Sequence, residues 1–494
     1  MKMNMRNMRL SAMGLGMLAM AAGLGGCGGG GEDKTALVKQ IPVNTPASIV
    51  QESDADYNLN VNGLITAATL KRWKDDWLNE RPAGITGKLV ILQVSNGCPH
   101  ADCKSVSTLT APDETPVYIK PNGINVFTYL SPSDDWIQTR SNGVIETPSM
   151  VPDGTAMDAL LRKFNIDPQR DMIVAAMGQG STGNAMAQGR IWYALRYWGV
   201  DKKNLAILNG GNQWINGNGM VAGDFQATAS SAPHNGHASV RDLMVDNTQL
   251  QATVQDMLAI LPGSDVNVKN DGVFIWDARS IAQYSAGETT TAAPVTTGSL
   301  MGSFQNSGSR QGHPYGALQL EFTNLLVAAQ GFRYKDKSDL QAYLDGNVSG
   351  QGFIEGGTYA HVGVGNAYQP GDTVYTYCET TFRAMITGIA SAVILGKPTR
   401  FYDGAMIEWN SLTPGSVTLD ATGNAILPED SPWRTNVKSF LRAASDPSLV
   451  AQRYITDAYA KTTNAIVNAD KAYKYGQVIP TAGTNAPPAN PCGG

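Results

Sequence analysis

Short, continuously apolar runs alternate with longer segments of helical periodicity along this 494-residue chain. In the first half, three such runs bounded by polar residues or glycine predict strands buried on both faces: 88–94, 172–176 and 205–208. The spacing of apolar residues between and before them predicts three helices: 64–80, 157–164 and 185–198. Strands that alternate with helices in this way indicate a parallel sheet covered by helices on both faces.

The same order of elements recurs in the second half. Strands are expected at 273–276, 374–377 and 400–402, and helices after 315–327 and over 384–395. Residues 185–189 align without gaps on 384–388, and Asn209-Gly210 with Trp214 corresponds to Asp403-Gly404 with Trp409. Several matches in one order indicate a duplicated domain.

These patterns divide the chain into six parts. They are a signal peptide (1–26), a tether (27–63), a first domain (64–222), a linker with a helix over 248–261 (223–262), a second domain (263–475) and a disordered tail (476–494). Two segments rich in small residues, 289–310 and 334–371, enlarge the second domain. Loops of that length are usually covers over a site or mobile segments.

The first residues have the features of an exported lipoprotein. Lys2, Arg6 and Arg9 precede an apolar stretch at 10–24, which is short for a membrane span, and Leu24-Gly25-Gly26-Cys27 follows. This segment resembles a bacterial lipobox, in which Cys27 becomes the lipidated first residue. We therefore expect a cell-envelope protein, anchored by lipid, at the outer membrane.

Composition and the remaining cysteines narrow the function. Charged residues make up 16% of the chain and the net charge is −5, which does not favour a nucleic-acid partner. In an oxidising compartment Cys98 and Cys103 are expected to form a disulfide, although a metal site with His100 is an alternative. Cys492 lies in the tail, and no cofactor is expected.

Cys378 follows an expected strand and stands five residues before Arg383, which opens an apolar helix. The loop Glu379-Thr380-Thr381-Phe382 can curl around the sulfur, so that backbone N–H groups at the beginning of the helix, together with Arg383, stabilise a thiolate. Such a thiolate can attack an electrophilic sulfur and hold it as a persulfide. We call residues 378–383 the cysteine loop.

Five segments in the second half resemble, in order, the signature segments of the rhodanese family. They are Asp277-Ala278-Arg279, Tyr284 with Gly287, Gly312-His313-Pro314-Tyr315-Gly316-Ala317, the cysteine loop, and Tyr402-Asp403-Gly404 with Glu408-Trp409. The resemblance covers most of 265–412 and, more faintly, 64–217. It implies an α/β fold of two rhodanese-like domains, each a parallel sheet flanked by helices, with long insertions in the second.

The same resemblance implies a sulfurtransferase with Cys378 as the persulfide carrier and the cysteine loop as its anion cradle. A small sulfur-containing donor and a thiol acceptor would be its partners, with envelope proteins as further candidates. Asp277 and Arg279 are expected to buttress the loop, whereas His313, Glu408 and Trp409 are expected to be structural. The alignment places Gln179 opposite Cys378, so the first domain is expected to be inactive.

Departures from the family pattern leave other functions open. Glu379 stands where thiosulfate-using relatives often have a basic residue, and Gln283 replaces an arginine sometimes found before the tyrosine. A carboxylate in that place should repel a dianion such as thiosulfate. The alternatives are a phosphatase or an enzyme that handles oxyanions such as selenite or tellurite, and a non-catalytic accessory protein of an outer-membrane electron conduit. Four residues between Cys378 and Arg383 make the loop shorter than a phosphatase loop.

Overall fold

The computed structural model describes residues 41–97, 117–142, 146–262, 267–285, 312–356, 359–413 and 464–476, with the short strand segments 418–419, 425–426 and 453–454. All of them belong to one compact unit, 40–494. Several expectations from the sequence lie outside the described residues: the signal peptide, lipidation at Cys27, the pairing of Cys98 with Cys103, the insertion 289–310 and the tail beyond 476.

The first half forms a five-stranded sheet in which every pairing is parallel. Its strands, in spatial order, are β1 (Gly63–Ile65), β8 (Leu205–Leu208), β7 (Met172–Ala176), β2 (Leu89–Gln93) and β4 (Val126–Leu130). The central strands are buried along their whole length, as continuous apolar runs require. The three strands predicted in this half are therefore confirmed.

The second half repeats this architecture. Its strands, in spatial order, are β10 (Gln251–Ala252), β16 (Thr399–Tyr402), β15 (Thr373–Tyr377), β11 (Val273–Asp277) and β12 (Leu318–Gln319), again all parallel. When the five strands of each sheet are numbered by their order along the chain, both sheets have the spatial order 1-5-4-2-3. This shared order confirms the duplication and the predicted fold class.

One of the helices predicted for the linker and second half is shorter than expected, and another follows a stretch of short strands. The helix expected over 248–261 begins only at Val254, as α7 (Val254–Ile260), because residues 251–252 pair with β16. The segment interpreted as a linker thus supplies an edge strand of the second sheet. The helix expected after 315–327 is present as α10 (Lys337–Leu344), and the stretch that leads to it contains β12, a 3₁₀ turn (Phe322–Leu325) and β13 (Leu326–Val327).

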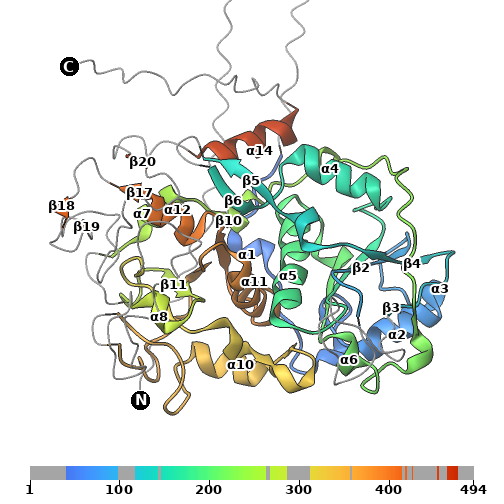
Figure 1. The fold of residues 1–494 in the computed structure, drawn as a ribbon, viewed down its shortest axis with the longest axis horizontal. Coiled ribbons are helices and arrows are strands. Elements are labelled where there is room, and N and C mark those ends of the chain that lie inside the picture. The colour runs from blue at the N-terminus through green and yellow to red at the C-terminus, as the bar shows by residue number, and fades with distance from the viewer. Residues whose placement is uncertain are drawn as a thin grey trace, which may run out of the picture. The chain divides into compact units, whose positions relative to one another are not determined.

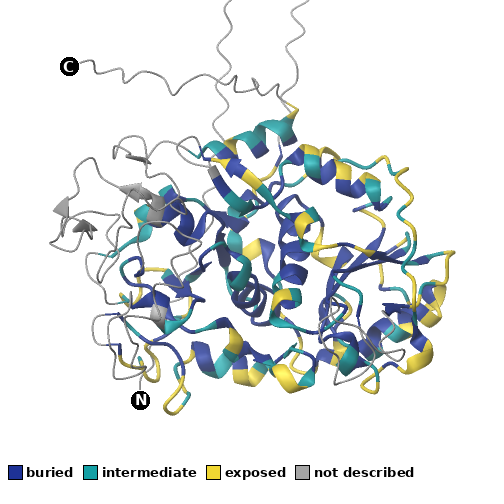
Figure 2. Ribbon diagram, in the orientation of Figure 1, coloured by how far each residue is buried: buried dark blue, intermediate teal, exposed yellow. Residues whose placement is uncertain are grey.

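The two halves meet through helices that the alignment had paired. They are α5 (Thr182–Tyr197) and α11 (Phe382–Ile389), the latter continued by a π-helical turn, Ala390–Ile394. Figure 1 shows them side by side, and Figure 2 shows both as mostly buried. A Cβ atom added to Gly189 would lie 2.6 Å from Cβ of Met385, so the helices approach closely because residue 189 has no side chain.

Shorter elements cover the sheets and connect them. The remaining helices are α1 (Pro46–Ile49), α2 (Ala67–Asp75), α3 (Trp77–Glu80), α4 (Gly154–Lys163), α6 (Asn212–Ile215), α8 (Ile281–Tyr284), α10 (Lys337–Leu344), α12 (Ala405–Ser411) and α14 (Ala465–Tyr475). The remaining paired strands are β3 (Tyr118–Ile119) with β9 (Phe225–Gln226), β5 (Gln138–Ser141) with β6 (Glu146–Met150), and β13 with β14 (Arg333–Tyr334). Part of the predicted insertion 334–371 is therefore helical, as α10. Two further pairs, β17 (Leu412–Thr413) with β20 (Arg453–Tyr454) and β18 (Thr418–Leu419) with β19 (Ala425–Ile426), follow α12.

Two terminal segments pack where the sequence did not place them. Residues 41–63, interpreted as part of a tether, lie against both halves, since Ile49 is fully buried and Ser53 Oγ donates a hydrogen bond to the carbonyl of Val393 at 2.9 Å. Helix α14, assigned to the second domain, contacts α4 and β5 of the first. The assignment of α14 to one domain from sequence order alone therefore missed its packing.

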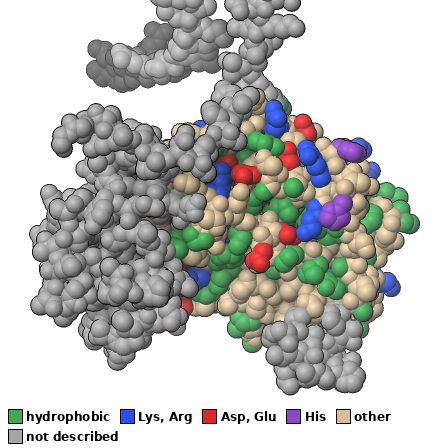
Figure 3. All heavy atoms as spheres, turned by 45° about the horizontal axis from the view of Figure 1, so that its top comes forward, with side chains coloured by type: hydrophobic (Ala, Val, Ile, Leu, Met, Phe, Trp, Pro, Cys, Tyr) green, Lys and Arg blue, Asp and Glu red, His purple; other side chains and the backbone are tan. Residues whose placement is uncertain are grey.

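The face of the molecule drawn in Figure 3 carries both charged and hydrophobic side chains. On the face drawn in Figure 3, acidic and basic side chains are interspersed with small hydrophobic groups. Among the described residues, no helix is both long enough and apolar enough to cross a bilayer.

Candidate active site

Cys378 stands at the carboxyl end of β15, where the chain turns towards α11. This is the edge of a parallel sheet at which open α/β folds bind ligands. The side chain is fully buried, with 0% of its surface exposed, and no other cysteine lies among the described residues. The expected position after a strand and before a helix is thus observed, but the thiol is enclosed in this conformation.

The cysteine loop is held in place by the chain that follows β16. The backbone N–H groups of Met406 and Ile407 donate to the carbonyls of Cys378 and Glu379, both at 3.0 Å. The hydroxyl of Thr381 donates towards the carbonyls of Tyr402 and Asp403, both at 2.9 Å. Residues 402–407 therefore clamp the loop at three of its residues.

Thr381 has an unusual backbone conformation that depends on this clamp. Its φ is 64°, in the left-handed region that costs a side-chain-bearing residue about 1–2 kcal/mol. It stands at the N-cap of α11, yet its hydroxyl caps no N–H of that helix because it is engaged with the end of β16. The first N–H groups of α11, which have no acceptor inside the helix, are thus left to interact with an anion.

Asp277 and Arg279 form a fully buried ion pair near the loop. Arg279 Nη2 lies 2.7 Å from Asp277 Oδ2, and Tyr377 donates its hydroxyl to the same oxygen at 2.7 Å. Burial alone would lower the pKa of Arg279, but Asp277 and then Glu379 raise it above its ordinary value. The guanidinium of Arg279 therefore stays charged, and the pair lies next to the loop that it was expected to buttress.

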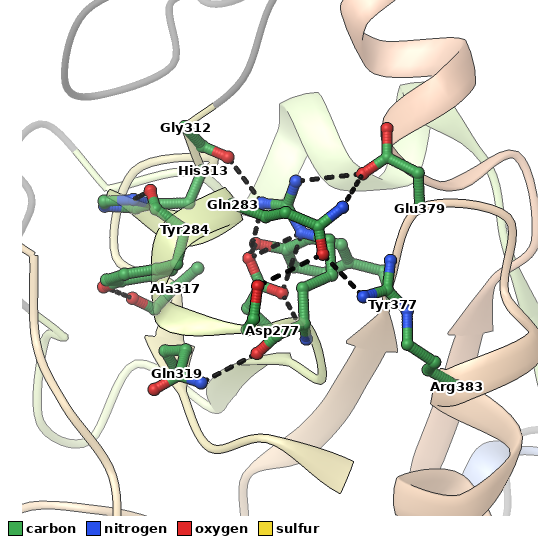
Figure 4. Close-up of polar contacts among 12 residues, drawn as sticks. Asp277, Gln283, Tyr284, Gly312, His313, Ala317, Gln319, Tyr377, Glu379 and Arg383 are labelled. Atoms are coloured by element: carbon green, nitrogen blue, oxygen red, sulfur yellow. Dashed lines mark hydrogen bonds and ion pairs between the residues drawn. The ribbon is translucent and has the colours of Figure 1, made fainter. Parts of the chain in front are cut away.

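The same arginine also binds the residue that follows the thiol. Arg279 Nη1 lies 3.2 Å from Glu379 Oε2, and Gln283 Nε2 donates to that oxygen at 3.3 Å. The other end of the Gln283 amide accepts from Arg383 Nη1 at 2.5 Å, as Figure 4 shows. Two carboxylates and two guanidinium groups thus balance one another, so Glu379 contributes less repulsion than its position in the sequence suggested.

His313 and Tyr284 form a buried stack beside this network. Their ring centroids lie 3.7 Å apart, His313 Nδ1 contacts the carbonyl of Tyr284 at 2.8 Å, and the Tyr284 hydroxyl donates to the carbonyl of Ala317 at 2.6 Å. These contacts join α8 to the chain leading into β12. The structural role expected of His313 agrees with this geometry.

Glu408 is more than a packing residue. Its carboxylate is buried and accepts a hydrogen bond from Asn142, which comes from the first half. Burial raises its pKa to about 7, with Asp403 adding to the rise and hydrogen bonds from Tyr402 and Asn142 opposing it. A carboxyl that titrates near neutral pH therefore lies where the two halves meet.

The corresponding loop of the first half has different chemistry. Gln179 follows β7, its N–H donates to Ser95 Oγ at 3.2 Å, and its carbonyl accepts from Asn184 Nδ2 at 2.7 Å. The stretch 177–184 contains neither a thiol nor an arginine. Without a nucleophile this loop cannot carry a sulfur.

Sequence reasoning missed the residues that join the halves behind the site. Asn142 and Arg190 belong to no motif, and their partners Glu408 and Asp403 lie more than 200 positions away. The one hint in the sequence was that Asp403-Gly404 corresponds to Asn209-Gly210 in the first half. The described residues contain no group of three or more His, Cys, Asp or Glu side chains that could hold a metal ion.

Comparison with known proteins finds similarity at the level of structures. No family model and no curated protein matches the chain. The Tum1 protein from Saccharomyces cerevisiae is similar at 14% identity, with a TM-score of 0.47, over 71% of this chain and 95% of that one. SseA from Escherichia coli, described as having the rhodanese fold of 3-mercaptopyruvate sulfotransferases, is similar at 17% identity and a TM-score of 0.44, over 70% of this chain and 98% of its own. The 3-mercaptopyruvate sulfurtransferase from Leishmania major is similar at 14% identity and a TM-score of 0.42, over 70% and 74%.

These values are too low to assign an activity to the chain. The architecture rests on the protein's own geometry, in which two parallel sheets with one strand order carry a cysteine loop on the second sheet only. In its fold, the chain is a tandem α/β protein of two parallel sheets, as the repeated order of strands and helices in its sequence predicted.

Proposed function

We propose that this protein is a sulfurtransferase that carries sulfane sulfur as a persulfide on Cys378. The observation that carries the proposal is the position of the thiol between β15 and α11, in a loop clamped by residues 402–407, with Arg383 in the first turn of the helix. An anion formed at the sulfur would meet the N-terminal N–H groups of α11 and the charge of Arg383.

The transfer takes two displacements in which atoms and electrons balance. The Cys378 thiolate attacks the outer sulfur of a donor, a new sulfur–sulfur bond forms, and the donor's bond to that sulfur breaks, its electrons leaving with the remaining anion. A thiolate acceptor then attacks the outer sulfur of the persulfide, takes that sulfur, and releases the Cys378 thiolate. No external oxidant or reductant is needed, and no residue of the site changes its net protonation over the cycle.

Burial of Cys378 adds a requirement to this scheme. A thiol with no exposed surface cannot meet a donor until the chain around it opens. The same burial favours a second candidate, in which the fold serves as a non-catalytic accessory protein and the cysteine only fills the core. For either role, we propose that the protein is located on the cell envelope and is held there by lipid on Cys27.

Mass spectrometry of the intact protein distinguishes these functions. The full chain is incubated with a polysulfide, thiosulfate or 3-mercaptopyruvate, alkylated and digested. We expect the Cys378 peptide to gain one sulfur atom with at least one donor, and Cys378→Ser to gain none there. No sulfur on Cys378 with any donor, under conditions in which iodoacetamide does modify it, would overturn the proposal and leave the accessory role.

A further inference from the structure

A buried ion pair connects the chain that follows β16 to the first half. Arg190, in α5, is fully buried, and its Nη1 lies 2.6 Å from Asp403 Oδ1. The other carboxylate oxygen of Asp403 accepts the backbone N–H of Val151 at 2.6 Å. Both oxygens of a residue in the second half are therefore held by groups from the first.

Asp403 is also part of the clamp on the cysteine loop. Its backbone carbonyl, with that of Tyr402, accepts the Thr381 hydroxyl that accompanies the left-handed turn before α11. The guanidinium carbon of Arg190 lies 5.9 Å from the ring centroid of Phe382, the first residue of α11. Arg190 thus contacts the loop directly through Phe382 and indirectly through Asp403.

Among the described residues, the guanidinium of Arg190 has few polar partners. Among the described residues Asp403 is the sole carboxylate within ion-pair distance of Arg190, and the Nε and Nη2 atoms of Arg190 are buried without a hydrogen-bond acceptor. Because a buried charge is stabilised only by close partners, the guanidinium and the carboxylate hold each other in one geometry. A shift of either moves the carbonyl that Thr381 needs.

We propose that Arg190 is a positioning residue for Cys378, through which the domain without a sulfur carrier sets the geometry of the cysteine loop in the other domain. The inference rests on the proposed function for its biological meaning. It makes a separate claim about thiolate stabilisation, which can be measured without any sulfur donor.

The test uses the full chain and four variants. In Arg190→Gln the ion pair is lost, and in Arg190→Lys a cation is kept without the planar guanidinium. The matched control is Asp470→Asn, which breaks another buried ion pair, between Arg140 of β5 and Asp470 of α14 at 2.6 Å, outside the cysteine loop and the residues that clamp it. Arg190→Gln with Asp403→Asn removes both charges and replaces the single variant should that one not fold.

The rate at which iodoacetamide modifies the Cys378 peptide is measured from pH 5 to pH 10. A change of access to the buried sulfur alters the plateau rate at high pH, whereas a change of thiolate stabilisation moves the midpoint of the profile. We expect Arg190→Gln, or the double variant, to move the midpoint upward by roughly one pH unit, about tenfold in rate near neutrality. Arg190→Lys should move it less, and Asp470→Asn should alter the plateau alone.

A folded Arg190→Gln or double variant with an unmoved midpoint would overturn the positioning role, as would an equal shift in Asp470→Asn. Failure of the wild-type protein to accept sulfur from any donor would instead count against the proposed function. The alkylation profile would still report on Arg190.

Discussion

Glu379 and Arg279 are 100 residues apart in sequence, yet Arg279 Nη1 lies 3.2 Å from Glu379 Oε2. The residue next to the thiol is therefore tied to the buried pair at the end of β11. Its carboxylate is a partner of a guanidinium and of Gln283, and its negative charge is largely compensated at the site.

This compensation predicts how Glu379→Gln changes donor preference. The variant removes one negative charge and leaves Arg279 paired with Asp277, so the site becomes more positive without an unpaired buried acid. We expect turnover with dianionic thiosulfate to rise by about fivefold, on the order of 1 kcal/mol, while turnover with a neutral persulfide donor changes little. Steady-state kinetics with both donors measure the ratio, and an equal change for both donors would contradict a charge effect.

Glu408 should make the stability of the protein depend on pH. Its pKa is raised from 4.5 to about 7 in the folded protein, chiefly by burial, so the folded state binds the proton more tightly than the unfolded state. The stabilising contribution is present at pH 5 and is lost as the pH rises through 7. We expect the free energy of unfolding of the wild type, relative to Glu408→Gln, to fall by roughly 2–3 kcal/mol between pH 5 and pH 8. Urea titrations at both pH values measure this, and a pH-independent difference between the two proteins would contradict it.

The docking of α14 predicts a large effect far from the cysteine. Asp470 is buried, pairs with Arg140 at 2.6 Å and accepts the Tyr197 hydroxyl at 2.7 Å. Asp470→Asn leaves the charge of Arg140 buried without its partner, which should cost about 3–5 kcal/mol. Asp75 is half exposed and pairs with Lys71 and Lys74, and both lysines also pair with Asp224, so Asp75→Asn should cost less than about 1 kcal/mol. Chemical denaturation of both variants at pH 7 gives the comparison, and similar losses would show that α14 is not packed as described.

Replacing Gly388 by alanine should lower the stability of the protein, which is the opposite of what helix propensity alone suggests. A Cβ atom at this position of α11 would lie 1.9 Å from Cε1 of the buried Phe401 ring. Gly388→Ala should therefore destabilise the protein by about 1–3 kcal/mol through overpacking, although alanine favours helices. In Gly183→Ala, in the first turn of α5, the nearest atom would be 3.9 Å away, so this control should be neutral or slightly stabilising. Thermal unfolding distinguishes them, and a stabilised Gly388→Ala would show that Phe401 can move aside.

Local pattern was sufficient for the three central strands of each sheet and for the place of the thiol. Buried parallel strands must be apolar throughout, so 172–176 and 205–208 were recognised at their observed bounds. The position of Cys378 between a strand and a helix also follows from neighbouring residues alone. Local pattern missed β12, which pairs with β11, because an apolar stretch does not show whether a strand edge is available to it.

What the sequence by itself determined, then, is the repeated order of the central strands and their helices, and the place of Cys378 between a strand and a helix. The tertiary structure alone decided which charges meet: Arg279 with Glu379, Arg190 with Asp403, and Asn142 with Glu408. It also decided that the thiol is enclosed. The physical reason is that hydrophobic periodicity is a local property, whereas buried polar groups find partners wherever two surfaces close over them, at any distance along the chain.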